Sequence, residues 1–202
     1  CGNSASSTAL QKGLLSWTGS GALGGPLVET IFEAAAMGLL SEFKPVTIYG
    51  GPHLDTTLKN RLQLRAKSTG GIAFTRRLRL HLGKARIAVC MAGYMSAVDI
   101  MAARIPAVMV PGEQGGEQIF RARRLEQAGY VKILPADGLN ARSLADTVYE
   151  AIHSAREPLE VSLNGAWRSA EIIDAILSVG RDVLSALRAF STSDFTAKKG
   201  RS

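Results

Sequence analysis

The sequence contains few of the residues that form disulfide bonds or bind metal ions in small proteins. It contains two cysteines, Cys1 and Cys90, which is too few for a disulfide framework or a cysteine-based metal cluster. Cys90 lies in an apolar run, so we expect it to be a buried free thiol. The three histidines are far apart, and neither a metal-ligand spacing nor a Ser/His/Asp arrangement occurs. The sequence therefore predicts no metal site.

Long apolar runs are also missing. No stretch approaches the roughly 18 to 20 apolar residues that a membrane span needs. A hydrophobic content of 46% with 20% charged residues is typical of a soluble globular protein, and we expect a cytoplasmic one.

The length of 202 residues suits one domain with a substantial core. We place that domain at residues 13–190, after a disordered Ser-rich lead at 1–12 and before a basic polar tail at 191–202. The chain begins with Cys1 and not Met, so we expect a fragment of a longer protein. A processed lipoprotein is the weaker alternative.

Two common nucleotide-binding motifs are absent. No GxGxxG motif is followed by an acidic residue about 20 positions later, and GxxxxGK[ST] does not occur. The glycines at 19–25 lack the third glycine at the required spacing. The sequence therefore disfavours both a dinucleotide-dependent dehydrogenase and a P-loop kinase.

Acidic residues are missing from a 43-residue stretch, Thr56 to Val98, although the chain carries 17 of them. The same stretch holds nine basic residues: Lys59, Arg61, Arg65, Lys67, Arg76, Arg77, Arg79, Lys84 and Arg86. Two interpretations stay open, attraction to an anionic partner such as phosphate or an anionic membrane surface, and a solvated face without a partner. A nucleic-acid partner is disfavoured, because within this stretch Phe74 is the one aromatic residue before Tyr94, which leaves no stacking platform for bases.

Short apolar runs alternate with helical patterns along the chain. We predict strands at residues 14–18, 46–49, 72–75, 87–90, 107–110 and 131–134. We predict helices at 26–40, 55–66, 77–84, 141–154 and 166–187, with two more between 87 and 129. Strands that are apolar throughout are typical of a parallel sheet covered on both faces. The expected fold is a three-layer Rossmann-like α/β domain with about six parallel strands.

Two polar or glycine-rich breaks, at residues 92–96 and 112–118, each follow a predicted strand. The carboxyl ends of parallel strands meet at one edge of a sheet, where such folds bind their ligands. Each break also leads into a helix N-terminus, which attracts anions. We therefore expect the two breaks to lie side by side and to bind a phosphorylated or nucleotide ligand.

Residues 87–129 resemble the donor-binding half of family 28 glycosyltransferases. The features that carry the resemblance are the turn AGYMS at 92–96, Asp99 on the following helix, a proline-ended strand, a glycine-rich loop, and Glu117-Gln118 leading into Arg121-Ala122. The resemblance extends over roughly residues 13–187. It implies the C-terminal domain of a two-domain GT-B enzyme, whose N-terminal acceptor domain is absent from this chain.

The resemblance implies roles for the first break. Asp99 matches the acidic residue that accepts hydrogen bonds from the ribose hydroxyls. Gly93 lets the backbone approach the diphosphate, and Ser96 lies where a first-turn hydroxyl and backbone amides meet phosphate oxygens. Tyr94 either packs against the base or covers the turn.

Further site residues are implied in the same way. Glu117 and Gln118 match the pair that binds hydroxyls of the donor sugar. Ser20 and Gly21 match the loop that touches the pyrophosphate, and Thr75 falls where the backbone reads the uracil edge.

The function implied by the resemblance is a metal-independent hexosyltransferase that uses a UDP-sugar as substrate and needs no further cofactor. It would transfer a hexosyl or N-acetylhexosaminyl group to a hydroxyl acceptor. We assign no catalytic residue, because in this fold the general base comes from the missing domain. That domain, or a separate acceptor subunit, is an expected partner, docked on an exposed apolar patch.

Two alternatives remain. The first is a UDP-sugar epimerase or hydrolase on the same scaffold, for which Glu113 and Glu117 are the nearby carboxylates. The second is a non-catalytic nucleotide-sugar-binding subunit of a split transferase. That subunit would be cytoplasmic, with the basic stretch against the anionic inner face of the membrane.

Overall fold

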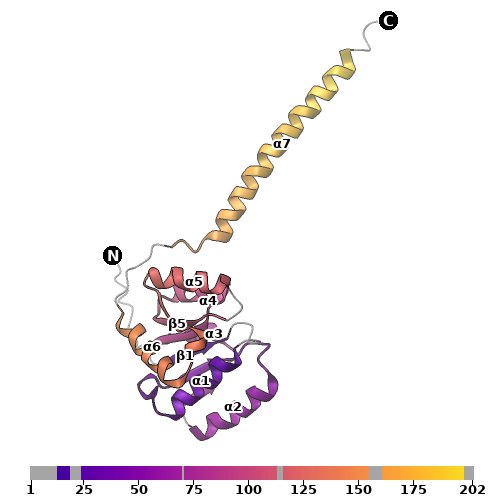
Figure 1. Ribbon diagram of the computed structural model, residues 1–202. Helices are drawn as coiled ribbons and strands as arrows, with labels where there is room; N and C mark the ends of the chain where they lie inside the picture. Colours follow the sequence, from indigo (N-terminus) through magenta and orange to yellow (C-terminus); the bar gives the residue numbers. More distant parts are fainter. Residues whose placement is uncertain (1–12, 19–23, 70, 113–115, 155–160, 198–202) are drawn as a thin grey trace, which may run out of the picture. The chain divides into compact units, whose positions relative to one another are not determined.

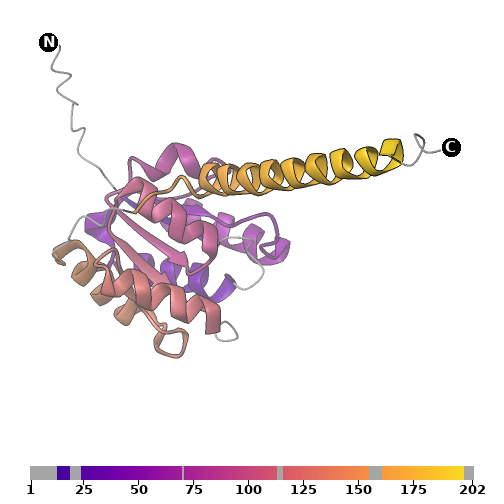
Figure 2. The same cartoon turned by 90° about the horizontal axis from the view of Figure 1, so that it is seen from above.

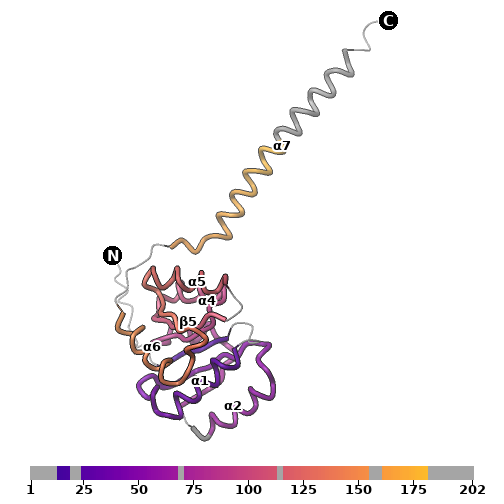
Figure 3. Tube along the Cα trace, viewed as in Figure 1, coloured from indigo at the N-terminus to yellow at the C-terminus, as the bar shows by residue number. Residues whose placement is uncertain are grey.

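The computed structural model describes residues 13–18, 24–69, 71–112, 116–154 and 161–197 (Figure 1). Two compact units make up the chain, Cys1–Leu159 and Glu160–Ser202. The first is an α/β unit, and Figure 3 follows its alternation of strands and helices along the Cα trace. The second contains one long helix.

A single six-stranded sheet with the strand order β3-β2-β1-β4-β5-β6 forms the centre of the first unit. Every neighbouring pair is parallel. The strands are β1 (Leu14–Trp17), β2 (Val46–Tyr49), β3 (Ile72–Phe74), β4 (Ile87–Met91), β5 (Ala107–Val110) and β6 (Val131–Ile133). The predicted six-stranded Rossmann-like fold is confirmed.

Helices cover both faces of this sheet, as Figure 2 shows from above. They are α1 (Gly25–Ala36), α2 (Thr56–Thr69), α3 (Leu78–Leu82), α4 (Tyr94–Ala103), α5 (Gly116–Gln127) and α6 (Ala141–His153), with short 3-10 turns η1 (Ser41–Phe43) and η2 (Ala136–Gly138). One core cluster packs α1, α2 and α6 against the sheet, and a second packs α3, α4 and α5 against its other face.

The two cores explain why the central strands β4 and β5 are apolar and buried along their whole length. Successive side chains of a strand point to opposite faces, so Leu14 belongs to the first core cluster while Leu15 and Trp17 belong to the second. The edge strand β6 differs, because its Lys132 is partly exposed. Cys90 in β4 is buried as a free thiol, as predicted.

Local signals set the helix boundaries. The Asp55 carboxylate accepts a 2.7 Å hydrogen bond from the Leu58 amide and so caps the start of α2. Helix α1 ends at Ala36 and not at residue 40, because Gly38 adopts a left-handed conformation with φ of 76° and stops the helix. At α6, Asn140 and Ser143 form a reciprocal capping box.

The second unit contains α7 (Gly165–Ala197), a helix of 33 residues. It continues beyond the predicted end at residue 187, so residues 191–197, which we assigned to a polar tail, belong to the helix. The reason is the backbone: no glycine or proline occurs between Gly180 and Gly200. Its described part exposes several apolar side chains, among them Trp167, Ile172, Ile173, Ile176, Leu177 and Val179.

None of the described helices is long and apolar enough to cross a membrane.

A glycine substitution tests the packing where β1 begins. Gly13 has φ of 85°, and a Cβ there would overlap the carbonyl oxygen of Pro45. We expect Gly13→Ala to lower the free energy of unfolding by about 2 to 4 kcal/mol, because left-handed strain adds to overlap with backbone. The matched control is Gly83→Ala, since nothing lies within 4 Å of a Cβ at that position. Urea denaturation measures both, and equal loss in the two variants would contradict this packing.

Candidate functional site

The strand order reverses between β1 and β4, the two central strands of the sheet. In open α/β sheets the crevice beyond the carboxyl ends of such strands is where ligands bind. The turn after β4 is described in full, whereas residues 19–23 after β1 are not. The predicted pyrophosphate contacts Ser20 and Gly21 therefore lie outside the described residues.

The turn after β4 leads directly into the N-terminus of α4. Gly93 is the N-cap residue, and its carbonyl oxygen accepts the first helical hydrogen bond, from the Ala97 amide, at 3.1 Å. No side chain caps this end of the helix. The first-turn amides and the helix dipole, worth roughly half an elementary charge, together favour an anion at this position.

Nothing in the protein itself requires glycine at position 93. Its φ of −68° and ψ of 161° suit any residue. A Cβ there would lie 3.6 Å from the nearest atom, Oγ of Ser96, which is ordinary contact. The missing side chain instead leaves the helix N-terminus open to a ligand.

Ser96 lies in the interior, with only 3% of its surface exposed. Its hydroxyl accepts a hydrogen bond of 3.0 Å from the Trp17 indole N–H, which joins β1 to α4. Its hydroxyl is thus engaged inside the protein, while its amide belongs to the first turn of α4.

The Cys90 thiol is protonated at neutral pH. Burial raises its pKa far above the ordinary value, the charge of Asp99 adds to the rise, and the Ser96 side chain opposes it. This cysteine is structural and not nucleophilic.

Asp99 lies farther along α4 and is partly buried. Burial raises the pKa of its carboxyl, and the nearby charge of Arg79 partly offsets this effect. A partly desolvated carboxylate is an effective acceptor for hydroxyl groups, because it has lost hydration that a ligand restores.

The second predicted break leads into α5. The side-chain oxygen Oε1 of Gln118 accepts a hydrogen bond of 3.0 Å from the Gly112 backbone amide and so links the start of α5 to the residues that follow β5. Glu117 is the neighbouring residue, and 86% of its side chain is exposed. Both predicted sugar contacts therefore stand at the start of α5, next to the residues that leave β5.

Arg121 connects the two breaks, and sequence reasoning gave it no role of its own. Its Nη1 donates to the Ala92 carbonyl oxygen at 3.0 Å, and its guanidinium lies over the Tyr94 ring at 5.6 Å. Its Nη2 pairs with the Glu117 carboxylate at 2.9 Å. The i,i+4 spacing of Glu117 and Arg121 was the one available signal. These contacts confirm that the two breaks lie side by side.

Thr75 lies on the same edge but past β3, two strands from β1. Its amide donates to the Ile48 carbonyl at 2.9 Å, and its hydroxyl accepts from the Arg77 amide at 3.0 Å. It lines a pocket of about 360 Å³ together with Tyr49, Gly50, Gly51, Pro52, Lys59, Gln63, Phe74 and Arg76. This pocket combines aromatic walls with two cations.

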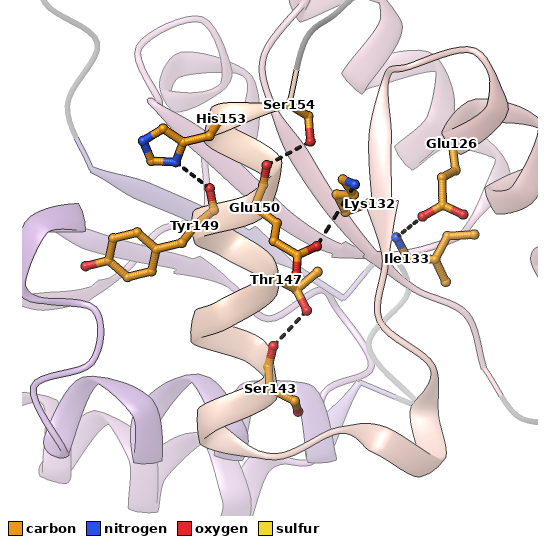
Figure 4. A network of polar contacts seen from close by, with 9 residues as sticks. All are labelled: Glu126, Lys132, Ile133, Ser143, Thr147, Tyr149, Glu150, His153 and Ser154. Atoms are coloured by element: carbon orange, nitrogen blue, oxygen red, sulfur yellow. Dashed lines mark hydrogen bonds and ion pairs between the residues drawn. The ribbon is translucent and has the colours of Figure 1, made fainter.

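Another pocket, of about 570 Å³, lies beyond β5 and β6 and is lined by residues that include Gly112, Ile119, Arg123 and Asp137. Glu126 also lines it and accepts a 2.9 Å hydrogen bond from the Ile133 amide. Figure 4 shows this bond together with the 4.0 Å ion pair between Lys132 of β6 and Glu150 of α6.

Over the described part of the chain, no three His, Cys, Asp or Glu side chains come close enough together to hold a metal ion.

The raised pKa of Asp99 has a consequence for stability. A carboxyl whose pKa is higher in the folded state contributes stability at low pH and loses that contribution as the pH rises through the folded value. We expect Asp99→Asn, which carries no charge, to unfold at a higher midpoint than the parent at pH 7. The difference should shrink as the pH falls toward about 4. Thermal unfolding across this range measures it, and a lower midpoint for Asp99→Asn at pH 7 would contradict the burial argument.

Comparison with known proteins identifies the family to which this chain is similar. Residues 22–176 match the family described as the glycosyltransferase family 28 C-terminal domain. Over 102 residues the chain is 32% identical to a UDP-N-acetylglucosamine–N-acetylmuramyl-(pentapeptide) pyrophosphoryl-undecaprenol N-acetylglucosamine transferase from Sodalis glossinidius. That match covers 50% of this chain and 28% of the relative, so the chain corresponds to only part of such a protein.

Solved structures show the same fold. The glycotransferase of kitacinnamycin superposes with a TM-score of 0.51 at 17% identity, over 71% of this chain and 36% of that one. The solution structure of ALG13 superposes with a TM-score of 0.56 at 14% identity, over 78% of this chain and 94% of that one. With the family match spanning most of its length, the chain belongs to the glycosyltransferase family 28 C-terminal domain family.

Proposed function

We propose that this chain is the donor-binding domain of a hexosyltransferase that uses a UDP-sugar and transfers a hexosyl or N-acetylhexosaminyl group to a hydroxyl acceptor. One observation carries the proposal. The uncapped N-terminus of α4 and the start of α5 meet at the edge where the strand order reverses, joined by Arg121. Phosphate, ribose and sugar each find suitable chemistry within this arrangement.

The proposed placement of the ligand follows the charges. The diphosphate lies against the first-turn amides of α4, where Gly93 leaves the backbone accessible. Asp99, farther along the same helix, accepts hydrogen bonds from the ribose hydroxyls. Glu117 and Gln118 reach the sugar from α5. The base lies toward Thr75 and the pocket after β3, where the carbonyl of Thr75 remains as an acceptor because its amide is engaged with Ile48.

The proposed reaction is displacement at the anomeric carbon of the sugar by the acceptor hydroxyl. The bond from this carbon to the diphosphate oxygen breaks, and negative charge develops on the leaving diphosphate. Helix N-termini and basic side chains stabilise this charge, so the proposal needs no bound metal. The proton of the acceptor hydroxyl passes to a base that we place outside this chain.

A second domain belongs to the proposal as the source of the acceptor site. Tyr94, Met95 and Phe120 are exposed at the starts of α4 and α5, which supports docking of a partner surface beside the donor. We propose a cytoplasmic location, with basic residues of the stretch between 56 and 98, such as those on α2, against the anionic inner face of the membrane.

The acceptor site in this proposal comes from a second domain of the same protein or from a separate subunit. The described residues give less support to an epimerase or hydrolase, because the Glu117 carboxylate is paired with Arg121. The other nearby carboxylate, Glu113, lies outside the described residues.

Calorimetric titration with UDP and with ADP tests the proposal. We expect saturable binding of UDP, with weaker binding of ADP. Asp99→Ala should weaken UDP binding by about 10- to 100-fold, because hydrogen bonds to a charged acceptor are lost. The matched control is Asp146→Ala, an exposed carboxylate on α6. A folded parent chain that binds neither nucleotide, or equal losses in both variants, would contradict the proposal.

Gly93→Ala tests the placement of the diphosphate separately. The added methyl group meets only ordinary contacts in the protein, so the midpoint of unfolding should hardly change. UDP binding should weaken about tenfold or more, because the methyl group stands between ligand and backbone. Unchanged UDP affinity in this variant would move the diphosphate away from the turn.

A further inference from the structure

Arg121 makes three contacts with groups from two different elements. Within its own helix it pairs with Glu117, and across to the β4–α4 turn it contacts the Ala92 carbonyl and the Tyr94 ring. Only 18% of its side chain is exposed. Fixing an arginine side chain costs rotamer entropy, so this largely covered guanidinium depends on its contacts through both terminal nitrogens to stay in place.

Packing of α5 does not depend on this side chain. Ala122 and Leu125 already fasten the helix to the second core cluster. Another arginine of the same helix, Arg124, is exposed and lies over the ring of Phe120 on its own helix, at 5.4 Å. Arg121 thus differs from Arg124 in reaching a different element and in contacting the candidate site.

The contacts of Arg121 connect the residue proposed to bind the sugar with the turn proposed to bind the diphosphate. Glu117 stands at the predicted sugar end, whereas Ala92 and Tyr94 flank Gly93 at the diphosphate end. We propose that Arg121 is a positioning residue that holds Glu117 in register with the β4–α4 turn, so that sugar and diphosphate are recognised together. This inference rests on the proposed function and adds the residue that couples its two halves.

The shape of the guanidinium matters for this role. Its Nη1 and Nη2 point to different partners at 3.0 and 2.9 Å. A lysine ammonium is a compact charge on a flexible stem and does not reproduce this planar fork. Arg121→Lys should therefore keep the charge near the site but lose the coupling, and it should resemble Arg121→Gln in sugar preference.

A measurement without ligand tests the positioning. In Arg121→Gln we expect amide hydrogen exchange at Gly93 and Ala97, whose amides donate to the carbonyl oxygens of Met91 and Gly93, to become about tenfold faster, because the turn loses its anchor to α5. Amide hydrogen exchange in the strands of the sheet should not change. The control is Arg124→Gln, which should leave the turn as it is in the parent chain. Unchanged exchange at both Gly93 and Ala97 in Arg121→Gln would overturn the inference.

A second measurement tests the coupling by comparing two ligands. Calorimetry gives the ratio of affinities for UDP-N-acetylglucosamine and UDP in each variant, and this ratio cancels any general loss of structure. We expect Glu117→Gln and Arg121→Gln each to reduce the ratio by about tenfold, and the double variant to reduce it no further. Additive reductions would mean that the two residues act independently, which would overturn the coupling.

The two proposals fail in different ways. A parent chain that is folded but binds neither UDP nor UDP-N-acetylglucosamine would overturn the proposed function and the coupling with it. Normal UDP binding, with the same sugar preference in the parent chain, Arg121→Gln and Arg121→Lys, would overturn the coupling alone.

Discussion

The position of the candidate site depends on the hydrogen bond that the Trp17 indole donates to the Ser96 hydroxyl. This bond is buried, and it joins the end of β1 to the first turn of α4 where the strand order reverses. Because a buried indole N–H left without a partner costs about 1 to 3 kcal/mol, the helix start is held at this position over the sheet. Gly93, Asp99 and the uncapped amides of α4 take their places from that anchor. The positions of these groups at the edge of the sheet therefore follow from a buried contact in the core.

A second connection brings in α5. Gln118 braces the end of β5 through the Gly112 amide, and Arg121 reaches across to Ala92. Together they place the predicted sugar contacts beside the predicted diphosphate contacts without any metal ligand set in the described residues. The chain belongs to the family 28 C-terminal domain family. Within this edge we propose that the start of α4 faces phosphate and the start of α5 faces sugar.

The local sequence pattern was sufficient to predict much of the fold. The strands predicted at 46–49 and 107–110 match β2 and β5 residue for residue, because short apolar runs bounded by turn residues leave little choice. Boundaries set by backbone conformation were harder, as at Gly38, where a left-handed residue ends α1 early. The roles of Asp99, Glu117 and Gln118 came from the family resemblance and stay predictions. Arg121 was overlooked because its partners Ala92 and Tyr94 are distant in sequence, and no periodicity reports a tertiary contact.

The most direct test of the central claim is to locate UDP on the protein by nuclear magnetic resonance. Backbone amide signals of the isotopically labelled chain would be followed during titration with UDP. The account predicts that the largest shifts fall on residues 93–99, with further shifts near Gly112 and Thr75, all at the carboxyl edge of the sheet. Shifts confined to the opposite edge, or to the basic face of α2, would contradict it, because UDP would then bind away from the place where β1 and β4 meet.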